Sequence, residues 1–446
     1  MTDLQYDFNK TSTITTKSGI QNLALSHSCE LPEINEIPCF FWGNLVDPYL
    51  TARCWMTISK VVRSSFGPLP ASLRDPIVTA GNERIRFEGF SSCNGVYTRL
   101  DMKPQAIDGE FIASGTTNVD FNEPMLNAFN MIQKNERVTL AVGDKEMQVI
   151  TERTKAIERK VKLPDRWIKG LSSVQLYLSD MELVFKTNKI QSIQIFQTLP
   201  KGNVKGDFFL INRLGKYSLS TIDSKPSVRI GGIHRLRLIE NLLPLITQMY
   251  WYVNSDGQTC SIVCDFENMQ LLLALSPDSN RGFSGEGKVF ENIQHDIPIE
   301  YITGLNHLLK SNESFDPTWF SIENDIELIT MDTLTANLSS IGLLGYDLEQ
   351  KEHFYRRLPF KHDRMLTLNP RLKNAKKILA TDDIQFIVNR PEYTEAHVKG
   401  TDSTHKVIIQ DNQSKCTCQW WTSYQGNRGI CKHILAVKLS KNNFEK

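Results

Sequence analysis

KCTCQWWTSYQGNRGICKHILAVKL, residues 415–439, holds three of the nine cysteines of the 446-residue chain. Cys416 and Cys418 are separated by one residue, twelve residues follow, and Cys431 and His433 are again separated by one residue. On a regular helix, residues i and i+2 point about 200° apart, so each pair must lie where the backbone changes direction. We therefore expect the first pair where the strand HKVIIQ ends in a turn, and the second at the start of the helix CKHILAVKL.

Three thiols and one imidazole in two close pairs form the ligand set of a structural zinc ion. Zinc favours four such ligands in a tetrahedron, and four protein ligands leave no open position for an activated water. Ordinary buried or free thiols are the alternative, but cysteine pairs in a reducing compartment more often bind metal. The sequence predicts one structural Zn²⁺ on Cys416, Cys418, Cys431 and His433, with metal binding contributing on the order of 10 kcal/mol to folding.

The amino-terminal sequence and the composition predict a soluble, cytoplasmic protein. The first residues, MTDLQYDFNKTSTITTKSG, lack the apolar core of a secretion signal, and the most apolar stretch, around 242–253, is too short to span a membrane. The nine cysteines show no regular framework, so we expect reduced thiols. A chain of this length with 40% hydrophobic residues is expected to form several domains.

The formal net charge of +1 conceals an uneven distribution along the chain. Residues 351–446 carry 18 Lys and Arg against 9 Asp and Glu, a balance of +9, whereas the first 350 residues carry 33 against 41, a balance of −8. A basic C-terminal end suits contact with phosphates or with an acidic protein face. A solvated surface explains the same excess without any ligand.

Strand and helix patterns predict a multidomain α+β protein with a strand-rich amino-terminal region. Helical signals occur at 47–66, 122–133, 165–180, 188–199 and, as an apolar-rich helix, 234–253. Strand or hairpin patterns occur at 84–90, 95–102, 110–121 and 138–150. We predict a polar tail (1–40), an α+β domain (41–200), an α+β middle domain (208–298), a winged-helix-like module (299–360) and a basic region (361–446) with a small zinc finger at about 395–440.

The winged-helix-like prediction rests on a helix, helix and hairpin pattern. IEYITGLNHLLK (299–310) and MDTLTANLSSIG (331–342) are helical, and GLLGYDLEQKEHFYRR (342–357) reads as two strands joined at 349–352. In a winged helix, the wing tip and return strand would carry Lys351, Arg356 and Arg357. An ordinary helix and hairpin completing another α+β domain explains the same pattern.

The pattern Cys-x-Cys followed by Cys-x-His, with a strand before it and an Ile-Leu-Ala helix after it, resembles the SWIM zinc finger. The segments DGEFIASGTTNVDFN, ERKVKLPDRWIKG, SPDSNRGFSGEGK and GYDLEQKEHFYRRLPF also resemble bacterial SWIM zinc-finger proteins found with MoxR-type AAA+ ATPases and von Willebrand factor A domain proteins. The resemblance covers most of the chain from about residue 40. It implies zinc binding through the same four residues, a role in DNA or protein interaction, and partnership with a MoxR-type ATPase and a von Willebrand factor A domain protein. It implies no known reaction.

Tryptophans and basic residues around the zinc ligands are candidate contacts for nucleic acid or a partner. Trp420 and Trp421 either pack over the zinc as a miniature core or offer a stacking platform for an unpaired base. The basic candidates are Lys415, Arg428 and Lys432 beside the ligands, Arg371, Lys373, Lys376 and Lys377 in PRLKNAKKIL, and Arg356 and Arg357 on the hairpin. A solvated amphipathic helix explains the PRLKNAKKIL pattern without a ligand.

Three other signals are weak. GFSGEGKV (282–289) matches the start of a phosphate-binding P-loop but has Val289 where magnesium binding needs Ser or Thr. Cys260 and Cys264 share one strand face without a partner pair, which predicts core packing. The acidic residues of the amino-terminal region match no catalytic template: Asp101, Asp108, Glu110, Asp120 and Glu123.

Two classes of function follow from these patterns. The first is a zinc-binding adaptor whose finger, with or without the winged-helix-like module, binds nucleic acid, protein or both. The second is an enzyme of unknown reaction with its active site in residues 40–200 or 265–290, delivered to its target by the finger. No catalytic residue is predicted for it. Binding that weakens steeply with salt would favour phosphate contacts in the first class.

Overall fold

Helices and antiparallel sheets occur in both of the units into which the chain divides. The computed structural model describes residues 14–17, 20–23, 40–66, 76–81, 83–119, 121–144, 146–159, 165–202, 204, 206–279, 282–283, 314–340, 342–356, 370–400, 403–410, 413–426 and 429–444. The first unit comprises Met1–Trp167, Tyr177–Phe283 and Arg356–Pro359, and the second comprises Ile168–Leu176, Ser284–Tyr355 and Phe360–Lys446. This architecture confirms the predicted α+β class and the strand-rich amino-terminal region.

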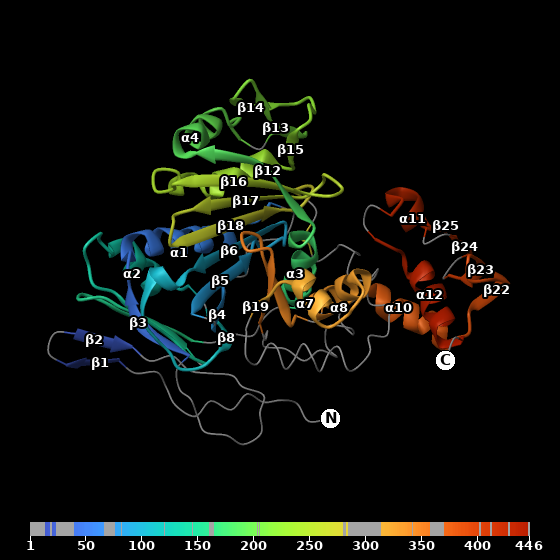
Figure 1. Ribbon diagram of the computed structural model, residues 1–446, viewed down its shortest axis with the longest axis horizontal. Coiled ribbons are helices and arrows are strands. Elements are labelled where there is room, and N and C mark those ends of the chain that lie inside the picture. The colour runs from blue at the N-terminus through green and yellow to red at the C-terminus, as the bar shows by residue number, and fades with distance from the viewer. Residues whose placement is uncertain are drawn as a thin grey trace, which may run out of the picture. The chain divides into compact units, whose positions relative to one another are not determined.

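An eight-stranded antiparallel sheet is the main sheet of the first unit (Figure 1). Its strands, in spatial order, are β12 (Met181–Asn188), β16 (Gln248–Asn254), β17 (Cys260–Asp265), β18 (Met269–Leu275), β6 (Val96–Met102), β5 (Arg84–Phe90), β4 (Ile77–Gly81) and β8 (Gly115–Asn118). Strand β6 pairs with β18, where Leu100 lies opposite Leu271. Strands from both sides of residues 200–207 therefore belong to one sheet.

Helix α1 (Pro48–Val62) packs on β5 and β6. It begins where its sequence signals predict, because the Asp47 carboxylate accepts a hydrogen bond from the amide of Leu50 at 2.9 Å and Pro48 occupies the first turn. The helix buries Trp55 completely, and the ring centroid of Trp55 lies 5.4 Å from that of Phe87 in β5. A capped, amphipathic helix thus covers part of the sheet with large apolar side chains.

Further sheets and helices make up the rest of the first unit within its described residues. A five-stranded sheet has the order β11 (Lys155–Arg159), β10 (Glu146–Ile150), β9 (Thr139–Val142), β3 (Phe41–Leu45) and β7 (Ile107–Phe111). A three-stranded sheet has the order β14 (Lys216–Ser220), β13 (Phe208–Arg213) and β15 (Ser227–Ile230). A two-stranded sheet consists of β1 (Ile14–Lys17) and β2 (Ile20–Leu23). The helices predicted over 122–133, 165–180 and 188–199 correspond to α2 (Glu123–Met131), α3 (Asp165–Leu178) and α4 (Lys189–Gln197). Residues Ile168–Leu176 of α3 belong to the second unit.

The helix predicted over 234–253 was wrong. Residues Ile233–Leu238 and Glu240–Leu242 form short 3-10 helices, and the following residues form β16. Pro244 cannot donate the backbone hydrogen bond that a continuing helix needs, and the Tyr-Trp-Tyr run of β16 favours a strand. No helix in the described ranges is long and apolar enough to cross a membrane.

A helix–hairpin module (residues 314–355) lies in the second unit. Its elements are β19 (Ser314–Phe315), α7 (Pro317–Glu323), α8 (Leu328–Ser340), β20 (Leu344–Asp347) and β21 (Glu352–Tyr355), with the sheet order β19-β21-β20. Its apolar core consists of Phe315, Phe320, Ile326, Met331, Leu334, Leu338 and Leu344. The helix and hairpin predicted over 331–357 are present, whereas the helix predicted over 299–310 lies outside the described residues.

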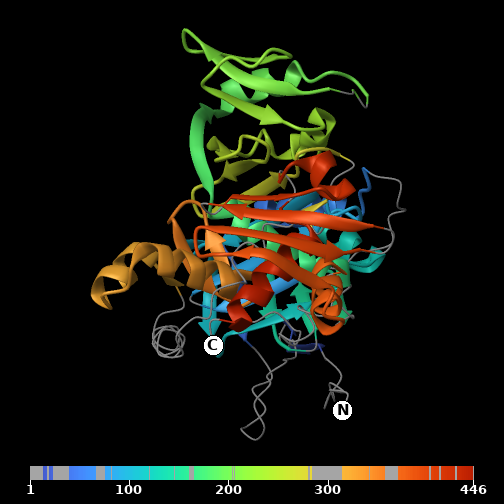
Figure 2. The same ribbon diagram turned by 90° about the vertical axis from the view of Figure 1, so that its right-hand side faces the viewer.

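A C-terminal module (residues 370–444) completes the described part of the second unit. It consists of a four-stranded sheet and three helices: β22 (Ile384–Asn389), β23 (Tyr393–Lys399), β24 (Thr404–Gln410), β25 (Gln413–Cys416), α10 (Pro370–Ala380), α11 (Gln419–Tyr424) and α12 (Lys432–Phe444). Figure 2 shows the strands side by side, in orange to red. Helices α10 and α12 pack against each other. Sequence patterns had predicted β24, α10 and the start of α12 but not β25 or α11.

Candidate metal centre

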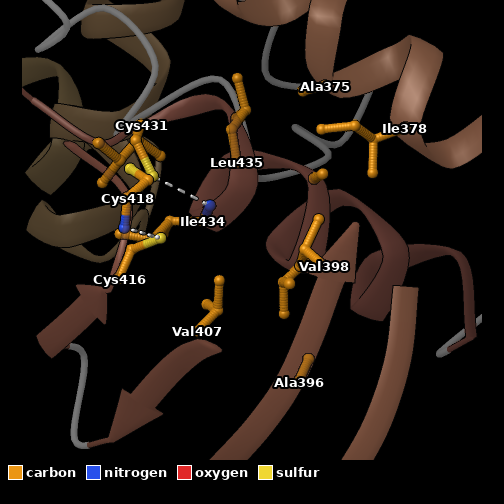
Figure 3. Packing of buried hydrophobic residues seen from close by; sticks show 13 residues of the cluster. Ala375, Ile378, Ala396, Val398, Val407, Cys416, Cys418, Cys431, Ile434 and Leu435 are labelled. Carbon is orange, nitrogen blue, oxygen red and sulfur yellow. Dashed lines mark hydrogen bonds between the residues drawn. The ribbon is translucent and has the colours of Figure 1, made fainter. Parts of the chain in front are cut away.

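The first cysteine pair lies where β25 ends and α11 begins. Cys416 is the last residue of β25, and its backbone lies opposite Val407 of the neighbouring strand β24. Cys418 is the N-cap residue of α11, and its backbone amide donates a hydrogen bond to the Cys416 sulfur at 3.4 Å. The change from strand to helix within three residues lets both sulfurs point to the same side, as Figure 3 shows.

The second pair lies at the start of α12. Cys431 immediately precedes the helix, and its sulfur accepts a hydrogen bond from the amide of Ile434 at 3.5 Å. His433 sits in the first helical turn, with its Nδ1 atom 3.8 Å from the sulfur of Cys416. The free amides of a helix start supply donors and the positive end of the helix dipole to the Cys431 sulfur, which suits a metal-bound thiolate. This placement is the one that the spacing predicted.

The four candidate ligand atoms converge on one point. One ligand atom from each of Cys416, Cys418, Cys431 and His433 lies within 4.8 Å of all the others, and the four residues are 2 to 5% exposed. Ligands about 2.3 Å from a tetrahedral zinc lie roughly 3.8 Å from one another, so the cluster needs little adjustment to enclose an ion. The donor set and its closed, buried geometry fit one structural zinc ion.

One thiol of this cluster, that of Cys418, differs electrostatically from the buried cysteines of β17. Hydrogen bonds from the thiols of Cys416 and Cys431 lower the pKa of Cys418, because they stabilise its thiolate. In β17, burial raises the pKa of both Cys260 and Cys264 to about 12, so these thiols stay protonated. Among the described residues, the C-terminal cluster is the one group of at least three His, Cys, Asp or Glu side chains placed to hold a metal.

Both tryptophans pack against the core that contains the ligands. The ring of Trp420 is covered by the guanidinium of Arg371, whose Cζ lies 4.0 Å from the ring centroid, and Tyr424 contacts the ring at 4.6 Å between centroids. The ring edge of Trp421 lies beside Gly426, where an added Cβ would approach it to 3.2 Å. The structure thus gives these rings a packing role around the candidate metal centre.

Arg371 links α10 to the candidate metal centre, a role that its sequence pattern does not indicate. Besides stacking on Trp420, Arg371 donates a hydrogen bond to the carbonyl of Ile430 at 3.3 Å, next to the ligand Cys431. The other basic candidates of α10 lie at the surface. Lys373, Lys376 and Lys377 are exposed. Lys415 is exposed and Lys432 half-buried, and Arg428 lies outside the described residues.

Sequence reasoning missed His405. Its ring lies against that of His433, with 4.3 Å between the ring centroids. Strand alternation provides the signal that would have found it, because His405, Val407 and Ile409 share one face of β24 and Val407 is fully buried. His405 therefore helps to hold the imidazole of His433 in place.

Arg356, predicted as a surface contact on the return strand, is buried in the first unit. Its guanidinium forms an ion pair with Glu88 of β5, and both side chains are fully buried. Tyr97 donates a hydrogen bond to the same carboxylate at 2.7 Å. Burial alone would raise the pKa of Glu88, but the charges of Arg356 and Arg99 outweigh it and lower the pKa. Arg356 has no free guanidinium for phosphate, Lys351 is exposed, and Arg357 lies outside the described residues.

The acidic candidates of the amino-terminal region do not come together where they are described. Asp101 is buried and forms ion pairs with Arg86 at 2.9 Å and Arg99 at 2.8 Å. Glu123 pairs with Arg63 at 2.7 Å, and Asp108 and Glu110 are exposed on β7. Asp120 lies outside the described residues, as does 284–289 of the glycine-rich stretch.

Comparison with known proteins gives one family match, at the C-terminal end. Residues 400–442 match the SWIM zinc finger. The match contains all four candidate ligands, so geometry and sequence family agree on the same site. The matched residues include β24, β25, α11 and most of α12, whereas α10, β22 and β23 precede them.

Solved structures similar to the chain include two whose titles name proliferating cellular nuclear antigen or PCNA proteins. Proliferating cellular nuclear antigen of Entamoeba histolytica has 11% identity and a TM-score of 0.38, over 54% of this chain and 99% of that one. The PCNA2–PCNA3 complex of Sulfolobus tokodaii has 9% identity and a TM-score of 0.40, over 53% and 99%. Both scores are too low to assign a function. None of the curated proteins matches the chain.

Proposed function

We propose that the chain is a zinc-binding adaptor whose C-terminal module binds the phosphate backbone of nucleic acid. The observation that carries this proposal is the basic face of α10. Lys373, Lys376 and Lys377 follow the i, i+3, i+4 spacing and are exposed, while Ala375 and Ile378 on the other side are buried. Clustered lysines on one helix face form the electrostatic footprint of a phosphate-binding surface.

The charge of the whole module supports the same proposal. Residues 370–444 contain 12 Lys and Arg against 6 Asp and Glu, a formal balance of +6. A positive field of this kind attracts polyanions and speeds their association. Trp420 and Trp421 are not assigned a stacking role, because they already pack against the core.

Zinc positions this basic face in the proposed mechanism. We assign Cys416, Cys418, Cys431 and His433 as the ligands, which hold β25, α11 and the start of α12 together. Helix α10 packs on α12, and Arg371 joins α10 to the residue before Cys431. Bound zinc would supply the folding free energy that so small a module lacks. Nucleic-acid binding is therefore expected to depend on the metal.

The test is salt-dependent binding of the zinc-loaded full chain to fluorescein-labelled single- and double-stranded 30-mers of DNA and RNA. We expect affinity to fall steeply as salt rises from about 50 to 200 mM, because each phosphate contact releases counterions. The triple variant Lys373→Glu, Lys376→Glu, Lys377→Glu should bind more weakly and show a salt slope smaller by about 2 to 3.

A matched variant separates this surface from general charge. Lys134→Glu, Lys201→Glu and Lys216→Glu change the net charge equally at exposed lysines of the first unit, and should leave affinity nearly unchanged. Equal losses in the two triple variants would contradict a specific role for α10. If the zinc-loaded chain binds none of these probes at low salt, the nucleic-acid proposal as a whole is contradicted.

A protein-binding role for the same chain is a second proposal, and the sequence resemblance supports it. We infer a bacterial, cytoplasmic setting with a MoxR-type AAA+ ATPase and a von Willebrand factor A domain protein as partners. We expect the chain to co-purify stably with such an ATPase, and we expect nuclease and high salt to leave this association intact. The proposal assigns no reaction, because the described acidic candidates do not converge.

A further inference from the structure

An exposed apolar patch lies on the two helices of the helix–hairpin module. It consists of Trp319 and Ile322 of α7, which are 66% and 65% exposed, and Leu328 and Ile329 of α8, which are 57% and 72% exposed. Single exposed apolar residues are normal on protein surfaces, but a cluster of large ones generally marks an interaction site.

These four residues lie toward the adjoining ends of the two helices. Trp319 and Ile322 are three residues apart and share one face of α7. A four-residue connection leads to α8, and it is held by a hydrogen bond from the amide of Ile326 to the carbonyl of Ser321 at 2.9 Å. The last turn of α7 therefore lies next to the first turn of α8 (Figure 1). The apolar core lies on the other sides of the helices, so the patch is an additional surface.

Acidic residues surround the patch. Glu323, Asp325, Glu327 and Asp332 are exposed on the same two helices and their connection. Residues 314–355 contain eight Asp and Glu against one Lys, a formal balance of −7. A partner that buries the patch must bring opposite charge to its rim, since like charges facing each other across an interface cost several kcal/mol.

This charge distribution excludes phosphate as the favoured ligand of the patch. In helix-turn-helix and related modules the second helix of the pair enters the major groove of DNA. Here that helix is α8, which contains Asp332 and no Lys or Arg. The module keeps the element order expected of a winged helix but lacks the positive surface that nucleic acid requires.

We propose that this patch is the docking site for a basic amphipathic helix of a partner protein. A helix with apolar residues at i, i+3 or i+4 and i+7 would cover Trp319, Ile322 and Ile329, and flanking Lys or Arg would face Glu323 and Glu327. A large aromatic side chain at such a site is the typical anchor of binding energy. This surface and ligand class are separate from the phosphate-binding proposal for α10, and each can fail without the other.

The experiment uses the zinc-loaded full chain and a fluorescein-labelled 18-residue helical peptide of Leu and Lys, with a Leu and Glu peptide of the same pattern beside it. We expect the Leu and Lys peptide to bind and the Leu and Glu peptide not to bind. The double variant Ile322→Ser, Ile329→Ser should weaken binding about tenfold or more. Because both side chains are exposed, it should fold normally, which thermal unfolding would verify.

Matched controls decide whether the patch is responsible. Ile190→Ser changes an equally exposed isoleucine of α4, at 67% exposure, and should leave affinity unchanged. The double variant Glu323→Lys, Glu327→Lys should weaken binding of the Leu and Lys peptide, although it leaves the apolar residues of the patch unchanged. No binding, or binding that the patch variants leave intact, would overturn the proposal. Loss of duplex DNA binding in the Ile322→Ser, Ile329→Ser protein would overturn it in favour of a nucleic-acid site.

Discussion

The helix–hairpin module and the C-terminal module are both small, but they differ in how they are stabilised and in the charge they present. Residues 314–355 enclose an apolar core of Phe, Leu, Ile and Met and carry a formal charge of −7. Residues 370–444 build their core partly from three cysteines and carry +6. This difference is the basis of the two proposals above, a metal-dependent basic surface for phosphates and a metal-independent acidic, apolar surface for a basic helix.

Metal removal should produce the largest difference between the two modules. In Cys431→Ser protein we expect loss of the zinc ion and of protection against hydrogen exchange across 370–444, because zinc contributes on the order of 10 kcal/mol to modules of this type. Protection across 314–355 should remain. Zinc content by elemental analysis and hydrogen-exchange mass spectrometry measure both effects.

The matched control for metal removal is Cys264→Ser, which changes a buried cysteine of β17. Zinc content in this variant should equal that of the unchanged protein, because Cys264 is outside the four-residue cluster. Full zinc occupancy in Cys431→Ser protein would contradict the ligand assignment.

Acid should weaken the helix–hairpin module through His353. Burial lowers the pKa of this residue to about 4, while the unfolded chain titrates near 6.5, so the unfolded state binds the extra proton first. The contribution of neutral His353 to the free energy of unfolding is fully present above about pH 6.5 and decreases as the pH falls toward 4. Below pH 4 the free energy of unfolding is lower by roughly 3 kcal/mol. His353→Gln should remove this dependence. Hydrogen exchange of 314–355 at several pH values tests it, and identical pH profiles in both proteins would contradict it.

Truncation of Trp420 should destabilise the C-terminal module more mildly than metal loss. Trp420→Ala removes the ring between Arg371 and Tyr424, and we expect a loss of about 2 kcal/mol with zinc still bound. Thermal unfolding measures the loss of stability, and the zinc content shows whether the ion stays bound. Arg371→Lys keeps the charge but loses the planar stacking, so it should cost less, about 0.5 to 1 kcal/mol. A Trp420→Ala protein with unchanged stability but lost nucleic-acid binding would favour the stacking platform.

Local signals in the sequence were sufficient for the metal centre and for several helices. The spacing of Cys416, Cys418, Cys431 and His433 determines which residues come together, because each pair lies at an element boundary within a short stretch. Asp47 and Pro48 similarly identify the start of α1. Such features depend on neighbours in the chain, so spacing and capping preferences predict them.

Contacts between distant segments were beyond sequence reasoning. Arg356 looks like a basic residue of a hairpin, yet its partner is Glu88, 268 positions earlier. Arg371 reads as part of a solvated helix, and only the fold places it on Trp420. In these two cases tertiary packing outweighed local pattern. The helix predicted over 234–253 failed for a partly local reason, because Pro244 and the Tyr-Trp-Tyr run already disfavour a helix and a sheet neighbour on each side of β16 stabilises the strand.

The most direct test of the division between the modules is hydrogen-exchange mass spectrometry of the zinc-loaded chain with and without a 30-base-pair DNA duplex at low salt. The account predicts new protection in α10 and the adjoining zinc finger, and none in α7 and α8. Protection confined to α7 and α8, with α10 unchanged, would contradict it.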